Sequence, residues 1–264
     1  MAASKAEQAP HSVRPYTPPN PNGPFPYSVK DLTPMDPGND KSFYSVPRWE
    51  DPNISLCIPT ESFFSFVTHI DDNAIHSLRK YYVDVLPRKG SILDFCSSWI
   101  SHYPPELEEA QKAGDLRVFG TGMNKSELSQ NPILAKWTIQ DLNEDPDVQL
   151  PQDEGEVRLD ASTCVVSIDY LTRPVDVLES IRRQTTDGGK VHLVISNRCF
   201  PTKVVGRWLK ISEDERLQMV GDYLWYSGWR EIEIVTVVQG TWMKDPLWVV
   251  RGTNTPSSAT GGME

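Results

Sequence analysis

The sequence predicts an α/β fold with a mostly parallel sheet of seven strands, helices on both faces and a C-terminal antiparallel hairpin. Three observations predict it. Short apolar runs bounded by turn residues recur along the chain, helical patterns separate most of them, and the last two runs follow each other without a helix. Alternating strands and crossover helices are typical of an open α/β sheet. The 264 residues are enough for one large domain.

Each element follows from a local pattern. Apolar residues at helical spacing predict a helix over about 71–85, which Pro87 stops. Apolar runs predict strands at 91–96, 116–122, 137–140, 161–168, 190–195, 231–238 and 247–250. Helical patterns, some with proline at the start and glycine after the end, predict helices at 105–113, 126–134, 174–185 and 201–228. The run at 161–168 is nearly all apolar or small, as expected for a strand covered on both faces.

The ends of the chain differ in composition from its middle. Residues 1–45 hold nine prolines and few aliphatic side chains, so we expect a proline-rich, largely disordered arm that is mostly solvated. The alternative is that its Phe25-Pro26-Tyr27 segment packs against the body. Residues 46–252 form the predicted domain, with the helix at 71–85 as its N-terminal cap, and 253–264 is expected to be a disordered tail.

Charge and composition exclude several classes of function. The net charge of −10 opposes attraction to phosphate backbones or anionic membranes, so no nucleic-acid or membrane partner is expected. Neither a long apolar span nor a secretory signal is found, which predicts a cytoplasmic protein. The four cysteines lack metal-ligand spacing, so no metal site is predicted.

Polar side chains follow four of the predicted strands at the point where each one ends. They occur at 94–98, 120–124, 140–143 and 169–174. The carboxyl ends of parallel strands meet at one edge of a sheet, where such folds bind ligands. We therefore expect these side chains to lie around one site.

These segments resemble the class I S-adenosylmethionine-dependent methyltransferases over roughly residues 65–250. The chain is similar to the methyltransferase type 11 group, in a branch whose first motif, Asp94-Phe95-Cys96-Ser97-Ser98-Trp99, is poor in glycine. Further matching pieces are 67–72, 122–124, 140–143, 167–174 and 196–203. The resemblance implies a Rossmann-like class I methyltransferase fold, S-adenosyl-L-methionine as cofactor, and methyl transfer to a small organic acceptor at oxygen, nitrogen or carbon.

The resemblance also implies a set of cofactor-binding residues. They are Asp94, Cys96, Ser97, Ser98, Asn124, Asp141, Leu142 and Ser167. Two positions depart from the family pattern. Cys96, Ser97 and Ser98 replace glycines, so we expect a turn that does not easily use positive φ. Asn124 offers one acceptor oxygen where a carboxylate normally binds both ribose hydroxyls, and Glu127 is an alternative partner. Asp141 and the Leu142 amide match the adenine site.

Each of these residues also has a purely structural interpretation. Asp94 at a strand end is equally expected to cap a helix or bind a backbone amide, and Ser97 and Ser98 to be turn residues. Asn124 and Asn143 are also candidate helix caps, and for Asn143 we favour that role over ligand contact.

The predicted catalytic residues are His69, Asp71, Tyr170 and Asn197, with His102 and Asp72 as further candidate bases. Arg198 and Cys199 are the predicted substrate-binding residues. Arg198 either holds an anionic group of the substrate or pairs with a nearby acid. The tryptophans of the last third of the chain are mostly core, and some are candidates for an acceptor pocket.

Two other functions stay open from the sequence. In one, the chain no longer methylates and serves as an interaction or regulatory module, with the arm contacting a protein partner. In the other, the same pocket catalyses a non-transfer reaction such as isomerisation or cyclisation. Fold class alone does not choose among them.

Overall fold

The structure, a computed structural model, describes residues 11–36, 43–44, 46–47, 70–151, 157–241 and 244–256. The predicted tail beyond residue 256 and the first ten residues of the arm lie outside these ranges. The described strands are β1 (Ser12–Pro15), β2 (Gly90–Phe95), β3 (Leu116–Gly122), β4 (Lys136–Ile139), β5 (Leu159–Val165), β6 (Thr185–Ser196), β7 (Arg230–Val238) and β8 (Leu247–Thr253). The helices are α3 (Asp72–Val85), α4 (Pro105–Lys112), α5 (Lys125–Gln130), α6 (Pro174–Arg183) and α7 (Glu213–Tyr226), with short 3₁₀ turns η3 (Ile168–Tyr170) and η4 (Trp208–Lys210).

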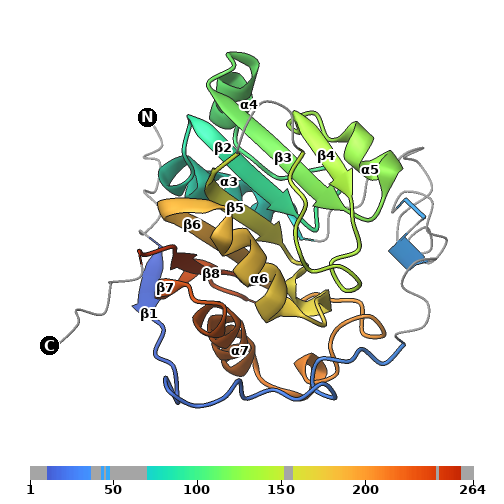
Figure 1. The fold of residues 1–264 in the computed structure, drawn as a ribbon, viewed down its shortest axis with the longest axis vertical. Helices are drawn as coiled ribbons and strands as arrows, with labels where there is room; N and C mark the ends of the chain where they lie inside the picture. Colours follow the sequence, from blue (N-terminus) through green and yellow to red (C-terminus); the bar gives the residue numbers. More distant parts are fainter. Residues whose placement is uncertain are drawn as a thin grey trace, which may run out of the picture.

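The strands form one mixed sheet in the order β1-β7-β8-β6-β5-β2-β3-β4 (Figure 1). Strands β2, β3, β4, β5 and β6 are parallel to one another, whereas β8 is antiparallel to both β6 and β7. The chain builds outward from β2 through β3 to β4 and then returns to β5 on the other side of β2. The direction of building therefore switches between β2 and β5, the place where open α/β sheets form a ligand crevice.

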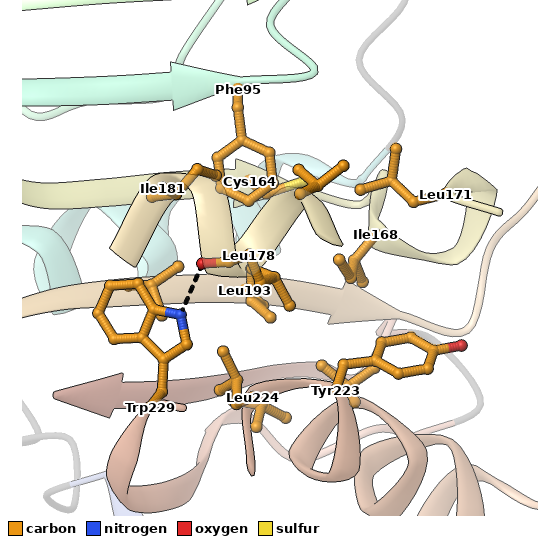
Figure 2. Close-up of a cluster of buried hydrophobic side chains, with 14 of the residues drawn as sticks. Phe95, Cys164, Ile168, Leu171, Leu178, Ile181, Leu193, Tyr223, Leu224 and Trp229 are labelled. Carbon is orange, nitrogen blue, oxygen red and sulfur yellow. Dashed lines mark hydrogen bonds between the residues drawn. The ribbon is translucent and has the colours of Figure 1, made fainter. Parts of the chain in front are cut away.

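Helices cover both faces of the sheet, and the alternation of side chains along each strand explains why. In β2, Ile92 belongs to the hydrophobic cluster under α3 and α4, whereas Leu93 and Phe95 belong to the opposite cluster under α6 and α7. Successive residues of a strand point to opposite faces. Figure 2 shows the second cluster, in which the indole N–H of Trp229 donates to the carbonyl of Leu178 at 3.0 Å.

The predicted fold class is confirmed, with two differences in the sheet. The sheet has eight strands rather than seven, because the arm contributes β1 along the edge of β7. The last two strands do form an antiparallel pair, but β8 is inserted between β6 and β7 instead of extending the edge.

The helix predicted over 201–228 is shorter than expected. It begins at Glu213, where Ser212 and Glu215 form a reciprocal capping box. Upstream of it, the backbone turns away to bond the arm: the Gly206 N–H donates to the Thr33 carbonyl and the Arg207 N–H to the Asp31 carbonyl, both at 3.0 Å. These contacts replace the helical hydrogen bonds that the sequence pattern predicted.

Part of the proline-rich arm packs on the domain, in contrast to the expected solvated segment. The phenols of Tyr16 and Tyr27 both donate to the carboxylate of Asp222 on α7, and the Phe25 ring lies edge-on to Tyr226 at 5.5 Å. Asp222 is 2% exposed, so its buried carboxylate needs hydrogen-bond donors within the protein. The alternative based on Phe25-Pro26-Tyr27 is therefore the arrangement found in residues 11–36.

None of the described helices is long and apolar enough to cross a bilayer.

The Tyr16–Asp222 contact gives a testable prediction. Tyr16→Phe removes a donor from a buried carboxylate, and we expect a loss of about 1–3 kcal/mol in the free energy of unfolding, measured by urea denaturation. Tyr226→Phe is the matched control, because this phenol donates to the Asn20 carbonyl at an exposed site. Equal losses in the two variants would contradict the role given to Asp222.

Candidate functional site

A cavity of about 350 Å³ opens at the switch point between β2 and β5. Segments that follow β2, β3, β4, β5 and β6 line it, so it lies at the carboxyl ends of the parallel strands. Eleven predicted site residues lie in its wall: Asp94, Cys96, Ser97, Ser98, Asn124, Asp141, Leu142, Ser167, Tyr170, Arg198 and Cys199. Trp99 is also part of the wall and leaves the cavity open.

The loop after β2 is organised by the buried carboxylate of Asp94. It accepts from the hydroxyls of Ser97 and Ser101, each at 2.6 Å, and from Thr163 on β5 at 3.2 Å. Burial raises the pKa of Asp94 to about 6, although these hydroxyl donors oppose the shift. Asp94 therefore holds the loop in shape and fixes the position of the residues around it.

Left-handed backbone conformations are concentrated at this cavity. Among the described residues other than glycine, four have positive φ, and three of them line the cavity: Cys96 (φ 53°), His102 (φ 55°) and Val166 (φ 43°). The expectation that the glycine-poor loop avoids positive φ is thus wrong at Cys96. Such conformations cost about 1–3 kcal/mol each and persist where the surroundings impose them, often at functional sites. Here the Asp94 network and the Val166 N–H bond to the Val194 carbonyl, at 2.9 Å, provide that support.

Gly122 at the end of β3 lets the two loops approach. A Cβ added there would lie 2.3 Å from the Ser97 carbonyl oxygen, so only glycine fits without a backbone shift. The Ser97 N–H donates to the Thr121 carbonyl at 2.8 Å. The glycine that this site needs therefore stands on the neighbouring strand, opposite the loop after β2.

Asn124 has structural hydrogen bonds on both sides of its amide. Its oxygen accepts from the Glu127 N–H at 3.1 Å and caps α5, and its Nδ2 donates to the Tyr44 carbonyl at 3.1 Å. This is the cap role that the sequence left open. Glu127, the other residue considered from the sequence, also lines the cavity and is 5% exposed.

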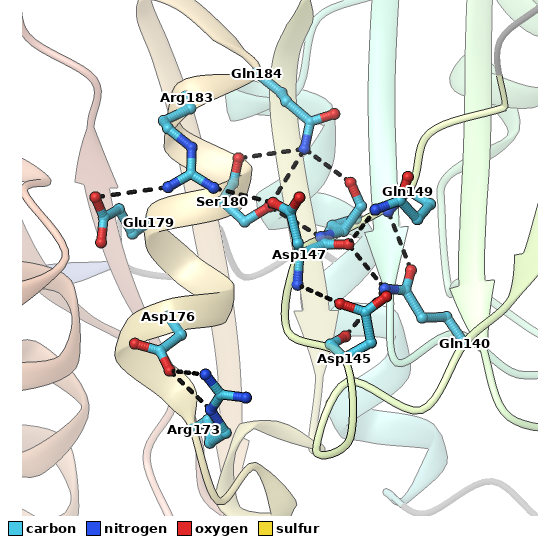
Figure 3. Close-up of polar contacts among 11 residues, drawn as sticks. Gln140, Asp145, Asp147, Gln149, Arg173, Asp176, Glu179, Ser180, Arg183 and Gln184 are labelled. Carbon is cyan, nitrogen blue, oxygen red and sulfur yellow. Dashed lines mark hydrogen bonds and ion pairs between the residues drawn. The ribbon is translucent and has the colours of Figure 1, made fainter.

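The loop after β4 presents Asp141 and Leu142 to the cavity. Asp141 accepts from the Asn143 N–H at 2.9 Å through one carboxylate oxygen; within the described part of the chain, its other oxygen and the Leu142 N–H make no hydrogen bond. Gln140 fixes this loop by donating to the carbonyls of Asp145 and Asp147 (Figure 3). The result is a preformed acceptor and donor side by side.

Asn143 joins two of the loops instead of capping a helix. Its Nδ2 donates to the Tyr170 carbonyl at 3.1 Å, and its Oδ1 accepts from the Thr172 N–H at 2.8 Å. The loops after β4 and β5 are therefore held at a fixed spacing.

Two of the predicted catalytic residues do not line the cavity. Asp71 caps α3: its carboxylate accepts from the N–H groups of Ala74 at 2.7 Å and Asp245 at 3.0 Å. Burial opposes ionisation, but these donors and the charge of Arg198 hold the pKa of Asp71 below its ordinary value. A capped, ionised carboxylate fits a structural role. Asn197 is exposed next to the cavity, and His69 lies outside the described residues.

The predicted residues on the substrate side of the cavity are paired or neutral. Arg198 pairs with Asp245 at 2.6 Å, which is the acid-pairing alternative. The Tyr170 hydroxyl accepts from the Phe200 N–H at 2.8 Å, and burial raises the pKa of Tyr170 well above its ordinary value. Burial, followed by the nearby charge of Asp169, also raises the pKa of Cys199, so its thiol stays protonated.

The aromatic wall comes from segments other than those the sequence suggested. Trp208 and Trp229 are core residues, and none of the described tryptophans of the last third lines the cavity. Tyr44 and Phe200 do line it, together with Tyr170. Tyr44 went unnoticed because it lies in the proline-rich arm, where a pair of aromatics, Phe43 and Tyr44, was the available signal.

Comparisons with known proteins give a likeness of fold. No family model matches the chain, and no curated protein matches it either. Among solved structures, a chain of the complex between the Haloferax volcanii Trm112 methyltransferase activator and a methyltransferase aligns at 15% identity, over 70% of this chain and 92% of that chain, with a TM-score of 0.47. An S-adenosylmethionine-dependent methyltransferase from Listeria monocytogenes aligns at 10% identity over 69% and 99%, with a TM-score of 0.46. One from Mesorhizobium loti aligns at 14% identity over 67% and 97%, with a TM-score of 0.45.

These similarities concern the arrangement of the elements, and at such identities and TM-scores they do not define an activity. The sheet order of this chain itself confirms the predicted Rossmann-like fold. The lining of the cavity is therefore the basis for assigning a function.

Asp94→Asn should flatten the pH dependence of stability. Because the pKa of Asp94 is higher in the folded state than in the unfolded chain, this group favours folding at low pH, and the advantage is lost as pH rises through about 6. Relative to Asp94→Asn, the wild type should lose up to about 3 kcal/mol between about pH 4 and about pH 7, measured by urea unfolding.

The pKa of Asp169, which burial also raises, shifts both proteins alike and cancels in this difference. Asp145→Asn, in the loop after β4, is the control and should show the wild-type slope. An unchanged slope in Asp94→Asn would contradict the raised pKa.

Cys96→Gly tests the left-handed conformation. Glycine adopts φ near 53° without a Cβ penalty of about 1–2 kcal/mol, and its greater freedom in the unfolded chain offsets part of that gain. We expect a free energy of unfolding within about 1 kcal/mol of the wild type, whereas Cys96→Val should lose about 2–3 kcal/mol. Chemical denaturation compares them, and a glycine variant less stable than the valine variant would refute the assignment.

Proposed function

We propose that the protein transfers a methyl group from S-adenosyl-L-methionine to a small organic acceptor. The observation that carries the proposal is the acceptor and donor pair of Asp141 and the Leu142 N–H in the wall of the switch-point cavity. A carboxylate oxygen that makes no hydrogen bond within the described residues, next to a backbone N–H, is complementary to the amine and the ring nitrogen of adenine. The sequence resemblance assigns the same two residues to that task.

The other walls of the cavity suit the remaining parts of this cofactor. The carboxylate of Glu127 is a hydrogen-bond acceptor for ribose hydroxyls beside Asn124, whose amide is engaged as a cap. The close approach of Ser97 to Gly122 brings backbone and hydroxyl groups to the cavity where glycines serve in related proteins. When bound, the cofactor supplies an electrophilic methyl group on a sulfonium.

The residues after β5 and β6 are the candidates for holding the acceptor. Tyr170, Cys199 and Phe200 line that part of the cavity, and His102, which also lines the cavity, is a candidate base. Positioning of the acceptor atom in line with the methyl group supplies much of the rate enhancement in such a transfer. We leave the attacked atom, oxygen, nitrogen or carbon, open.

The interaction-module alternative has less support in the described residues. The arm segment that was expected to contact a partner is bound by its own domain through Asp222. A protein partner that contacts the rest of the arm stays a prediction, as does the cytoplasmic location.

Calorimetric titration with S-adenosylhomocysteine tests the proposal. We expect wild-type binding, and at least tenfold weaker binding for Asp141→Ala, because a hydrogen bond to a charged group contributes about 1.5–3 kcal/mol. Glu127→Gln should weaken binding by a smaller factor.

Asp145→Ala is the matched control for this titration. Asp145 lies in the same loop, its carboxylate accepts from the Asp147 N–H, and it does not line the cavity. Its affinity should equal that of the wild type. Absence of binding by the wild-type protein would refute the proposed function.

A further inference from the structure

An aromatic corner stands at one side of the cavity. Tyr44, Tyr170 and Phe200 all line it, although they come from the arm, from η3 and from the segment after β6. The ring centroids of Tyr44 and Tyr170 are 6.5 Å apart, and those of Tyr170 and Phe200 are 6.2 Å apart. These spacings are typical of interacting aromatic pairs, so the three rings form one continuous wall.

The position of Tyr44 is fixed by contacts on both sides. Its backbone carbonyl accepts from Nδ2 of Asn124 at 3.1 Å. The neighbouring Phe43 ring lies edge-on to Tyr44 at 4.9 Å and to Phe200 at 5.3 Å. An aspartate at position 124 would lack this donor. Asn124, which differs from the pattern of the family that the sequence resembles, thus binds the arm.

Lys203 secures the same segment of the arm. Its side chain is 2% exposed, and its ammonium group donates to the Asp36 carbonyl at 3.0 Å. The Nζ also lies 5.3 Å from the centre of the Phe43 ring, within range of a cation–π interaction. A buried cation needs such partners, so the arm and the segment after β6 stabilise each other.

Three polar side chains near the aromatic corner are either paired or neutral. Arg198 is paired with Asp245 at 2.6 Å, and burial keeps the phenol of Tyr170 and the thiol of Cys199 in their neutral forms by raising their pKa values. This part of the wall therefore offers ring faces and neutral polar groups to a ligand. Such a surface favours a flat, uncharged molecule over an anion.

We propose that Tyr44 determines substrate specificity: with Tyr170 and Phe200 it selects a planar, uncharged acceptor, and Asn124 and Lys203 are the positioning residues that hold it in place. This inference depends on the proposed function for the identity of the second ligand, but the recognition of a flat molecule can be measured separately.

The experiment compares two probes of similar size, flat 2-naphthol and its puckered, saturated counterpart decahydro-2-naphthol. Each is titrated into the full chain, with and without saturating S-adenosylhomocysteine, and binding is followed by ligand-observed NMR. The wild type should bind the naphthol about threefold to tenfold more tightly, the factor that corresponds to an aromatic contact of about 0.5–1.5 kcal/mol. Tyr44→Phe should keep this preference, and Tyr44→Leu should lose it.

Tyr226→Ala is the matched control, because Tyr226 belongs to the aromatic contacts between arm and α7 but does not line the cavity. It should keep the wild-type preference, and thermal unfolding confirms that each variant is folded. Equal binding of the two probes by the wild type, or an unchanged preference in Tyr44→Leu, would overturn the inference. If S-adenosylhomocysteine does not bind while the naphthol preference depends on Tyr44, the proposed function fails and the role of Tyr44 stands.

Discussion

The close approach of two loops at the centre of the sheet is the constraint on which the cavity depends. The Ser97 carbonyl oxygen lies 2.3 Å from the place that a Cβ of residue 122 would take, and the Ser97 N–H donates to the Thr121 carbonyl. To reach this position the chain adopts a left-handed conformation at Cys96. The buried Asp94 carboxylate, bonded to Ser97 and Ser101, supplies the energy that holds the turn closed. Together with the Ser97–Thr121 backbone hydrogen bond, these contacts offset the strain at Cys96.

Much of the fold follows from local sequence, because the signals that define it are local. Strand β3 and helix α3 agree with the predicted 116–122 and 71–85 to within a residue, since apolar periodicity and flanking turn residues mark them. The set of polar strand ends also met around one cavity, because sheet topology brings those ends together. The conformation of Cys96 was not predictable in this way. A cysteine disfavours positive φ. The contact that overrides this preference comes from Thr121, 25 residues further along the chain.

The packing of the arm is a second feature that local sequence did not predict. Its composition predicts disorder, since proline-rich segments bury little apolar surface. The contacts that order residues 11–36 are tertiary: Tyr16 and Tyr27 find the carboxylate of Asp222 about 200 residues away in sequence. A tyrosine in a proline-rich segment and an aspartate within a helix carry no local sign of being partners. For the same reason Tyr44 was not among the predicted site residues, although it stands in the wall of the cavity.

The two positions that differ from the pattern of the family that the sequence resembles have a common physical consequence. With Cys96 in place of glycine, the loop keeps its shape through the Asp94 hydrogen bonds, and with Asn124 in place of a carboxylate, an amide donor becomes available for the Tyr44 carbonyl. In both cases the site is held by hydrogen bonds within the protein. The loops of the cavity are thereby held by hydrogen bonds of the protein itself, while one Asp141 oxygen and the Leu142 N–H make no hydrogen bond within the described residues. A preformed site loses less conformational entropy on binding, which offsets the weaker contacts expected at the ribose. Under the proposed function, the choice of acceptor then depends on the aromatic wall formed by Tyr44, Tyr170 and Phe200.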